Sequence, residues 1–162
     1  MYVENNREKV IQVLKEYPEM KRKIGLLRFE LEHPASVTPE EMMESMSFAH
    51  GDGEGRSTGN PSNRTFYIAM KYQLAAEQAN ADITAQILSR LLPLEQRVKK
   101  VEYYLGLLEK DEEDVIRRHC FDRQSMNSIA AATGSSFWIV RRLRDEALDK
   151  LVQMISFVEG DN

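Results

Sequence analysis

The sequence predicts an all-α protein: an N-terminal helical segment with a seven-residue repeat, a long helix, and a C-terminal domain of three to four helices that contains a helix-turn-helix. Methionine, leucine, alanine and glutamate are plentiful, and few windows alternate between apolar and polar residues. Apolar residues recur at heptad spacing in two stretches, and a third stretch has glycine and small residues at helix-turn-helix offsets. A chain of 162 residues can hold one compact domain or two small ones.

Residues 1–33 are predicted to be a helix with an apolar seam. The first core position of each heptad is occupied by Val3, Val10, Tyr17, Ile24 and Leu31, which are seven residues apart. The second core position of the same heptads is occupied by Val13, Met20 and Leu27. This spacing is typical of helices that pack at small crossing angles. Pro18 lacks an amide donor and disfavours a helical residue before it, so we expect a kink or a break near 17–18.

Residues 34–64 are predicted to be a short helix followed by a flexible linker. Thr38 is placed to cap the helix, with Pro39 in its first turn and Glu41 completing a capping box, and the helix should reach roughly Phe48. The next segment, 50–63, contains four glycines. It lacks the Gly-Lys-Ser/Thr of a phosphate loop and the spaced ligands of a calcium loop, which leaves a linker.

Residues 65–108 are predicted to form one long helix that carries a second seam. The seam residues step by four and three: Ile87, Leu91, Leu94, Val98, Val101, Leu105 and Leu108. Pro93 should kink this helix, unless a new helix begins at Leu92 or Pro93. The two seams can pair with each other as an antiparallel hairpin or pair between chains in a dimer, and the sequence leaves both alternatives open.

Residues 109–158 are predicted to form the helix-turn-helix domain. With Met126 as the first position, Ala130 is fifth, Gly134 ninth and Val140 fifteenth. The fifth position needs a small side chain because two helices cross there, and the ninth ends the first helix with a positive φ that glycine adopts cheaply. Val140 and Leu143 should face Ile129. We expect Ser125 to cap the first helix and Ser135 or Ser136 to cap the second.

Roles in DNA binding follow from this geometry, because the N-terminal part of the second helix of such a unit enters the major groove. The residues predicted to face base edges are Ser136, Phe137, Trp138, Arg141 and Arg142. The residues predicted to contact phosphates are Arg117, Arg118, Arg123, Ser125 and Arg144.

The charge of the chain limits this prediction. The net charge is −4, and residues 110–151 hold eight basic and eight acidic side chains. Nonspecific affinity for DNA comes mainly from lysine and arginine, so we expect weak and salt-sensitive binding by this segment alone. Useful affinity would need a homo-oligomer, with a dimer favoured, or a partner protein.

The segment 108–151 resembles region four of bacterial sigma factors, the part that reads promoter DNA. The elements that carry the resemblance are Leu108, the acidic turn 112–114, Val115 to Arg117, the Ile129-Ala130 to Gly134 turn, and Ala147 to Leu151. The resemblance implies double-stranded DNA and RNA polymerase as partners and base-reading roles at Phe137, Trp138, Arg141 and Arg142. Phe137 and Trp138 depart from the usual polar pair. The whole layout is similar to small phage and prophage transcription regulators of the ArpU and RinA type.

Other classes of protein have less support. His33, His50 and His119 are scattered, and adjacent residues such as His119 and Cys120 point about 100° apart on a helix, so we predict no enzyme, metal or cofactor. A single cysteine and the lack of a long apolar run or signal peptide predict a cytoplasmic protein without membrane segments. Two alternatives remain: a phage terminase small subunit, and a module that docks on RNA polymerase without reading DNA.

Overall fold

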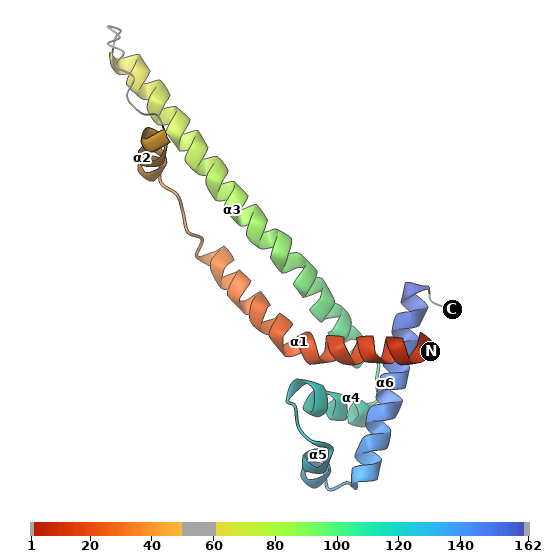
Figure 1. Cartoon of the computed structure of the whole chain (residues 1–162). Helices are drawn as coiled ribbons and strands as arrows, with labels where there is room; N and C mark the ends of the chain where they lie inside the picture. The colour runs from red at the N-terminus through yellow and green to blue at the C-terminus, as the bar shows by residue number, and fades with distance from the viewer. Residues whose placement is uncertain (1, 50–60, 161–162) are drawn as a thin grey trace. The chain divides into compact units, whose positions relative to one another are not determined.

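The computed structural model describes residues 2–49 and 61–160, and these residues form helices and short connections without a strand (Figure 1). The elements are α1 (Tyr2–Glu32), α2 (Pro39–Ala49), α3 (Pro61–Leu105), α4 (Lys110–Ile116), the π-helical turn η1 (Arg117–Phe121), α5 (Met126–Thr133) and α6 (Phe137–Glu159). The predicted all-α class is therefore confirmed. Most of the predicted glycine linker, residues 50–60, lies outside the described residues.

The chain divides into two compact units that do not follow the order of the sequence. The first unit joins residues 1–25 to residues 93–162, and the second unit is formed by residues 26–92. Both boundaries fall inside helices, since α1 and α3 each continue from one unit into the other.

Both prolines lie inside continuous helices. α1 includes Pro18 and α3 includes Pro93, so the predicted alternatives of a break at residue 18 and of a new helix at Leu92 or Pro93 are wrong. A helix can continue through a proline when it gives up one backbone hydrogen bond and bends locally. The long helix also begins at Pro61, four residues earlier than the predicted start at residue 65.

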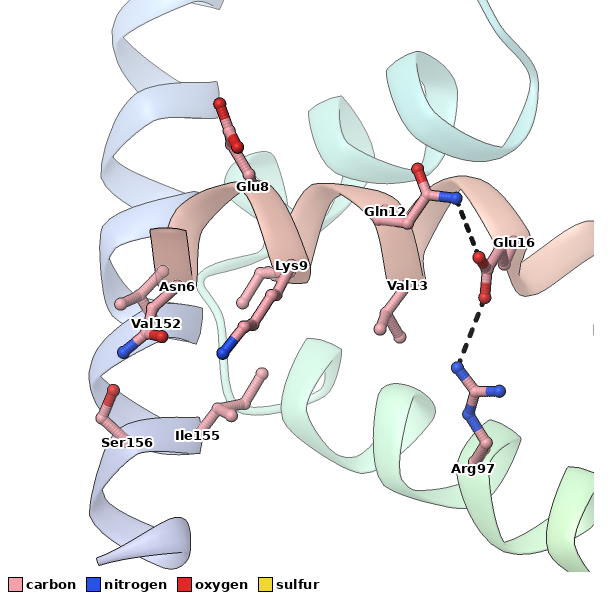
Figure 2. Close-up of a pocket in the computed structure, with 11 residues that line it drawn as sticks. Asn6, Glu8, Lys9, Gln12, Val13, Glu16, Arg97, Val152, Ile155 and Ser156 are labelled. Atoms are coloured by element: carbon pink, nitrogen blue, oxygen red, sulfur yellow. Dashed lines mark hydrogen bonds and ion pairs between the residues drawn. The ribbon is translucent and has the colours of Figure 1, made fainter. Parts of the chain in front are cut away.

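In the first unit the two heptad seams pair within the chain. The seam of α1 is buried at Val10, Tyr17, Met20 and Ile24, as are residues Val98, Val101 and Leu105 of α3. Leu14 of α1, which the heptad assignment missed, is buried as well. Polar contacts flank this apolar contact: the Tyr17 hydroxyl donates to Glu102 Oε1 at 2.5 Å. Figure 2 shows Glu16 between two donors, with Gln12 at 2.8 Å and Arg97 at 3.3 Å.

A buried carboxylate ties α4 to α6 in the same unit. Glu112 is only 3% exposed, and its Oε1 accepts from Lys150 Nζ of α6 at 2.6 Å. Its Oε2 accepts from the backbone N–H of Glu109 at 3.1 Å, so the same side chain also satisfies an amide at the start of α4. The acidic first turn that the sequence predicted is present, with Asp111, Glu112 and Glu113.

In the second unit, polar side chains fix the connection before α2. The Asn80 side chain accepts from the N–H of Val37 at 2.8 Å and donates to the carbonyl of the same residue at 3.2 Å. The predicted capping box is confirmed, because Thr38 N–H donates to Glu41 at 2.9 Å and Glu41 N–H donates to Thr38 Oγ1 at 3.2 Å. Several large apolar side chains of α3 in this unit are exposed: Phe66, Tyr67, Ile68, Met70 and Leu74.

Among the helices formed by residues 2–49 and 61–160, none combines the length and the apolar character that crossing a membrane requires.

The hydrogen bond between Tyr17 and Glu102 predicts an acid-dependent part of the stability. It lowers the pKa of Glu102 below the ordinary value of 4.5. A carboxyl group with a lowered pKa adds stability above its unfolded-state pKa, and this stability is lost as the pH falls through the folded-state pKa. Tyr17→Phe removes the hydroxyl but keeps a ring that can stack on Phe121, whose centroid lies 4.2 Å away.

We expect Tyr17→Phe to lower the free energy of unfolding by about 1 kcal/mol at neutral pH. The difference from the wild type should narrow as the pH falls below 4.5. Urea unfolding across this pH range measures both effects, and a difference that stays constant throughout would contradict the assignment.

Candidate nucleic-acid interface

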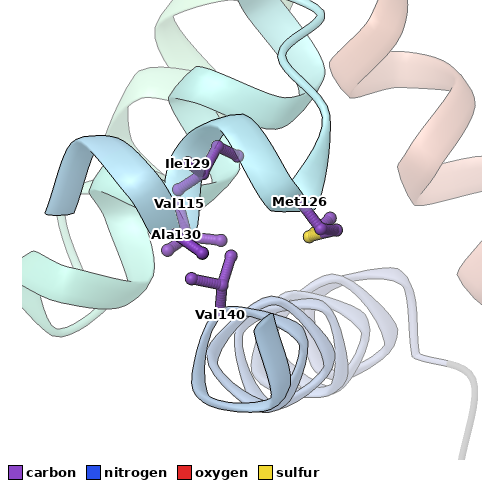
Figure 3. Close-up of a cluster of buried hydrophobic side chains, with 5 residues drawn as sticks. All are labelled: Val115, Met126, Ile129, Ala130 and Val140. Atoms are coloured by element: carbon purple, nitrogen blue, oxygen red, sulfur yellow. The ribbon is translucent and has the colours of Figure 1, made fainter. Parts of the chain in front are cut away.

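A small apolar cluster holds the short helices against α6 (Figure 3). Its buried members come from α4, α5 and α6 and are Val115, Met126, Ile129, Ala130 and Val140, with Leu143 packed partly against them. This confirms the predicted contact of Val140 and Leu143 with the Ile129 side of α5. Ala130 is buried in the cluster, where a longer side chain would push the helices apart.

The connection between α5 and α6 is a tight turn. Gly134 has a φ of 64°, which is the left-handed conformation that the sequence predicted there. The N–H groups of Gly134 and Ser135 both point back to the carbonyl of Ala130, the second at 3.0 Å, as at many helix ends.

Serine side chains begin both helices, as predicted. Ser125 Oγ accepts from Ser128 N–H at 3.1 Å. Ser136, and not Ser135, caps α6, because Ser136 Oγ accepts from Ile139 N–H at 3.3 Å. A hydroxyl that accepts one hydrogen bond still has a proton to donate, so capping leaves both serines able to bind an acceptor.

The first turns of α6 present the predicted base-facing side chains together. Trp138 is 68% exposed and Phe137 is 36% exposed, and the two rings meet edge to face at 5.5 Å. Trp138 is therefore not part of the buried core. The guanidinium of Arg141 lies 5.7 Å from the centre of the Trp138 ring, a cation–π distance, and Arg142 is more exposed than Arg141.

Arg141 and Arg142 form long ion pairs with acidic residues one helical turn later. Arg141 Nε lies 3.9 Å from Asp145 Oδ2, and Arg142 Nε lies 3.6 Å from Glu146 Oε1. Exposed pairs four residues apart on a helix contribute about 0.3–0.5 kcal/mol. Such contacts hold the side chains weakly, so another anion or a base edge can replace the carboxylates.

Three of the arginines predicted to contact phosphates have closer carboxylate partners. Arg117 donates to Glu113 and Arg118 donates to Asp114, each at 2.7 Å. Arg117 also lies 5.7 Å from the Phe121 ring centre. Arg144 donates to Asp145 through two nitrogens, at 3.0 and 2.6 Å.

Arg123 differs from these arginines. It is exposed, has a φ of 55°, and has no carboxylate partner among the described residues. Of the arginines predicted to bind phosphate, Arg123 has the charge that is most available to an incoming anion.

Sequence reasoning missed one participant, Arg7 of α1. Its guanidinium lies 2.9 Å from Asp145 Oδ1 and 3.6 Å from Asp149 Oδ1 on α6. Asp145 is thus shared by Arg7, Arg141 and Arg144. The contact joins residues 138 positions apart, and a heptad pattern gives no signal for a polar contact of this kind.

His119 and Cys120 are neighbours in η1, and Cys120 is buried. Burial raises the pKa of the Cys120 thiol, which disfavours the reactive thiolate. The His119 ring nitrogen Nδ1 lies 3.0 Å from the carbonyl oxygen of Gln124. In the described ranges no three histidine, cysteine, aspartate or glutamate side chains are grouped in a way that would hold a metal.

Comparisons of the chain with protein-family models, with curated proteins and with solved structures find no match. The fold class is all-α, and the candidate site consists of two capped helices, a tight glycine turn, and exposed aromatic and arginine side chains on α6.

The turn at Gly134 can be tested against a second glycine of the same chain. An added Cβ meets no atom within 4 Å at either Gly134 or Gly25, but only Gly134 has a positive φ. We expect Gly134→Ala to destabilise the protein by about 1–2 kcal/mol because of its left-handed backbone. Gly25→Ala, inside α1, should instead stabilise it by about 0.5–1 kcal/mol. Chemical denaturation measures both, and equal effects of the two changes would contradict the role of the turn.

Proposed function

We propose that the protein is a sequence-specific DNA-binding transcription regulator, not an enzyme, and that α5 and α6 are its helix-turn-helix. The observation that carries this proposal is the exposed start of α6, where Phe137, Trp138, Arg141 and Arg142 project beyond a buried cluster and a fixed turn. The resemblance of residues 108–151 to sigma region four supports the same function. It also suggests that the protein acts with RNA polymerase. The similarity of the whole layout to regulators of the ArpU and RinA type suggests a phage or prophage regulator, and the single cysteine suggests that it works in the cytoplasm.

In this proposal the first half of α6 enters the major groove. Arg141 and Arg142 would each bridge the two acceptors of a guanine, and Phe137 and Trp138 would contact thymine methyl groups. Ser136 has a hydroxyl proton to donate to a base edge, and Ser125 has one for a phosphate. Arg123, Arg117, Arg118 and Arg144 are the proposed phosphate contacts, and Arg123 needs no carboxylate to be displaced first.

The ion pairs of this region explain why the proposed binding is weak in a single chain. Each paired arginine must exchange a carboxylate for DNA, so the net gain per contact is smaller than for a free cation. We therefore propose that a homodimer or RNA polymerase provides the remaining affinity. The exposed apolar side chains of α3 between Phe66 and Leu74 are candidates for such a contact.

One observation favours a second candidate, a module that docks on a protein such as RNA polymerase. Phe137, Trp138 and Ile139 are consecutive, apolar and exposed at the start of α6. Aromatic side chains of this kind are enriched at protein interfaces. In this alternative the same surface would bind an apolar groove and would retain no DNA even at low salt.

The test of DNA binding begins with DNA fragments selected from a random pool by the full-length protein. We expect Arg141→Ala and Arg142→Ala each to weaken binding to the selected site about tenfold or more, because each removes a contact to base edges. Arg22→Ala is the matched control, since Arg22 is an exposed, ion-paired arginine of α1. Fluorescence anisotropy at several salt concentrations measures the effects.

If the two variants bind the selected site as tightly as the wild type, the proposed reading surface is wrong. If the wild type retains no DNA at low salt but Trp138→Ala abolishes binding to RNA polymerase, the docking alternative is correct instead.

A substitution of Glu146 tests the same proposal through an expected gain in affinity for DNA. Glu146→Gln removes the carboxylate paired with Arg142 at 3.6 Å and changes little else in shape. We expect affinity for DNA to rise about two- to threefold, in proportion to the small energy of an exposed pair. Glu19→Gln, which frees Arg22 of α1 in the same way, should leave the affinity unchanged. An equal gain from both variants would indicate a general effect of net charge.

A further inference from the structure

A second surface of the first unit collects positive charge. A hollow of about 420 Å³ lies between α1, η1 and α6, and four cationic side chains line it: Arg7, Lys15, Arg141 and Arg144. Among the described side chains that line it, Asp145 is the one carboxylate, and Asp149 reaches Arg7 from outside the lining at 3.6 Å. This local excess of cations stands out in a chain whose net charge is −4.

Asp145 holds two of the arginines closely and the third loosely. Asp145 Oδ1 lies 2.9 Å from Arg7 and 2.6 Å from Arg144, while Arg141 approaches Oδ2 at 3.9 Å. Two carboxylates, Asp145 and Asp149, face these three guanidinium groups, so positive charge and N–H donors remain for another anion. Lys15 is exposed and has no carboxylate partner among the described residues.

The rest of the lining suits a molecule larger than a single ion. Ile11 and Leu148 add apolar surface, and Leu148 is buried. The ring of His119 also reaches the hollow, with its Nδ1 at the Gln124 carbonyl. Pockets that bind small molecules have volumes of about 300–1,000 Å³ and combine apolar walls with a few convergent polar groups.

We propose that this hollow binds phosphate groups and has the size and lining for a phosphorylated small molecule such as a nucleotide. Guanidinium groups offer planar pairs of donors that match phosphate oxygens, and Lys15 adds a mobile point charge. The backbone of bound DNA offers the same chemistry and is the other possible source of the phosphate. Because Arg141 lines the hollow and also belongs to the proposed base-reading surface, a small ligand there would compete with DNA; only this last consequence depends on the proposed function.

The test uses the full-length protein and inorganic triphosphate as the probe. Trp138 is the single tryptophan of the chain, and its ring centre lies 5.7 Å from the guanidinium of Arg141, so its fluorescence should report occupancy of the hollow. Isothermal titration calorimetry in parallel measures binding without relying on the tryptophan. We expect saturable binding of triphosphate, weakened about tenfold or more by Lys15→Glu. Asp145→Asn should strengthen it by removing the competing carboxylate.

Lys9→Glu is the matched control. It makes the same charge change on the same helix, but Lys9 lines a different hollow with Val13 and Ile155 (Figure 2). It should leave triphosphate binding unchanged. Circular dichroism of each variant checks that it is folded.

The arms of the experiment separate the sources of phosphate. Saturable triphosphate binding that Lys15→Glu weakens and Lys9→Glu does not supports a small-molecule ligand, and it does so even if the protein binds no DNA. If triphosphate does not bind, but Lys15→Glu weakens binding to the selected DNA and Lys9→Glu does not, the phosphate comes from the DNA backbone. If triphosphate does not bind and the two lysine variants behave alike toward DNA, the proposal is overturned.

Discussion

The burial of one side of α6 is the constraint on which the other features of the first unit depend. Near its start Val140 packs against Ile129 and Ala130, and further along Leu148 and Leu151 are buried. A helix held along one side must expose the other, so the same packing that stabilises the domain also sets which way Trp138 and Arg142 face. The glycine turn at residue 134 fixes where this exposed side begins.

The availability of positive charge in this protein depends more on where the charged residues lie than on how many there are. The equal numbers of acids and bases in residues 110–151 become individual contacts, such as Arg118 with Asp114 and Lys150 with Glu112. The tightest contacts involve half-buried or buried partners, while the loosest ones lie on the exposed side of α6. Positive charge remains available at Arg123 and in the hollow beside Lys15, where no carboxylate of the described residues pairs with these two side chains. A neutral sequence segment can therefore still present local sites for anions.

Local features of the fold could be predicted from the sequence because their causes are local. The caps at Ser125 and Thr38 and the left-handed Gly134 follow from hydrogen bonds and backbone sterics within a few residues. The predicted break near Pro18 and the predicted new helix at Leu92 or Pro93 are wrong because packing along a long helix outweighs the loss of one hydrogen bond. The contact of Arg7 with Asp145 could not be predicted, since it depends on how distant helices pack. Heptad spacing identified the apolar seams, but it did not predict the polar contacts beside them, such as that of Tyr17 with Glu102.

The first unit is discontinuous in sequence, and this affects how the protein is made. During synthesis α1 leaves the ribosome well before its partners at the end of α3 and in α6, because the whole second unit lies between them in the sequence. Its apolar residues, including Leu14 and Met20, therefore stay without their native contacts until the end of α3 and α6 have been translated. Contacts between such distant segments slow folding and leave apolar surface open to aggregation in the interval. A nascent chain of this design thus has a period in which chaperones can bind it.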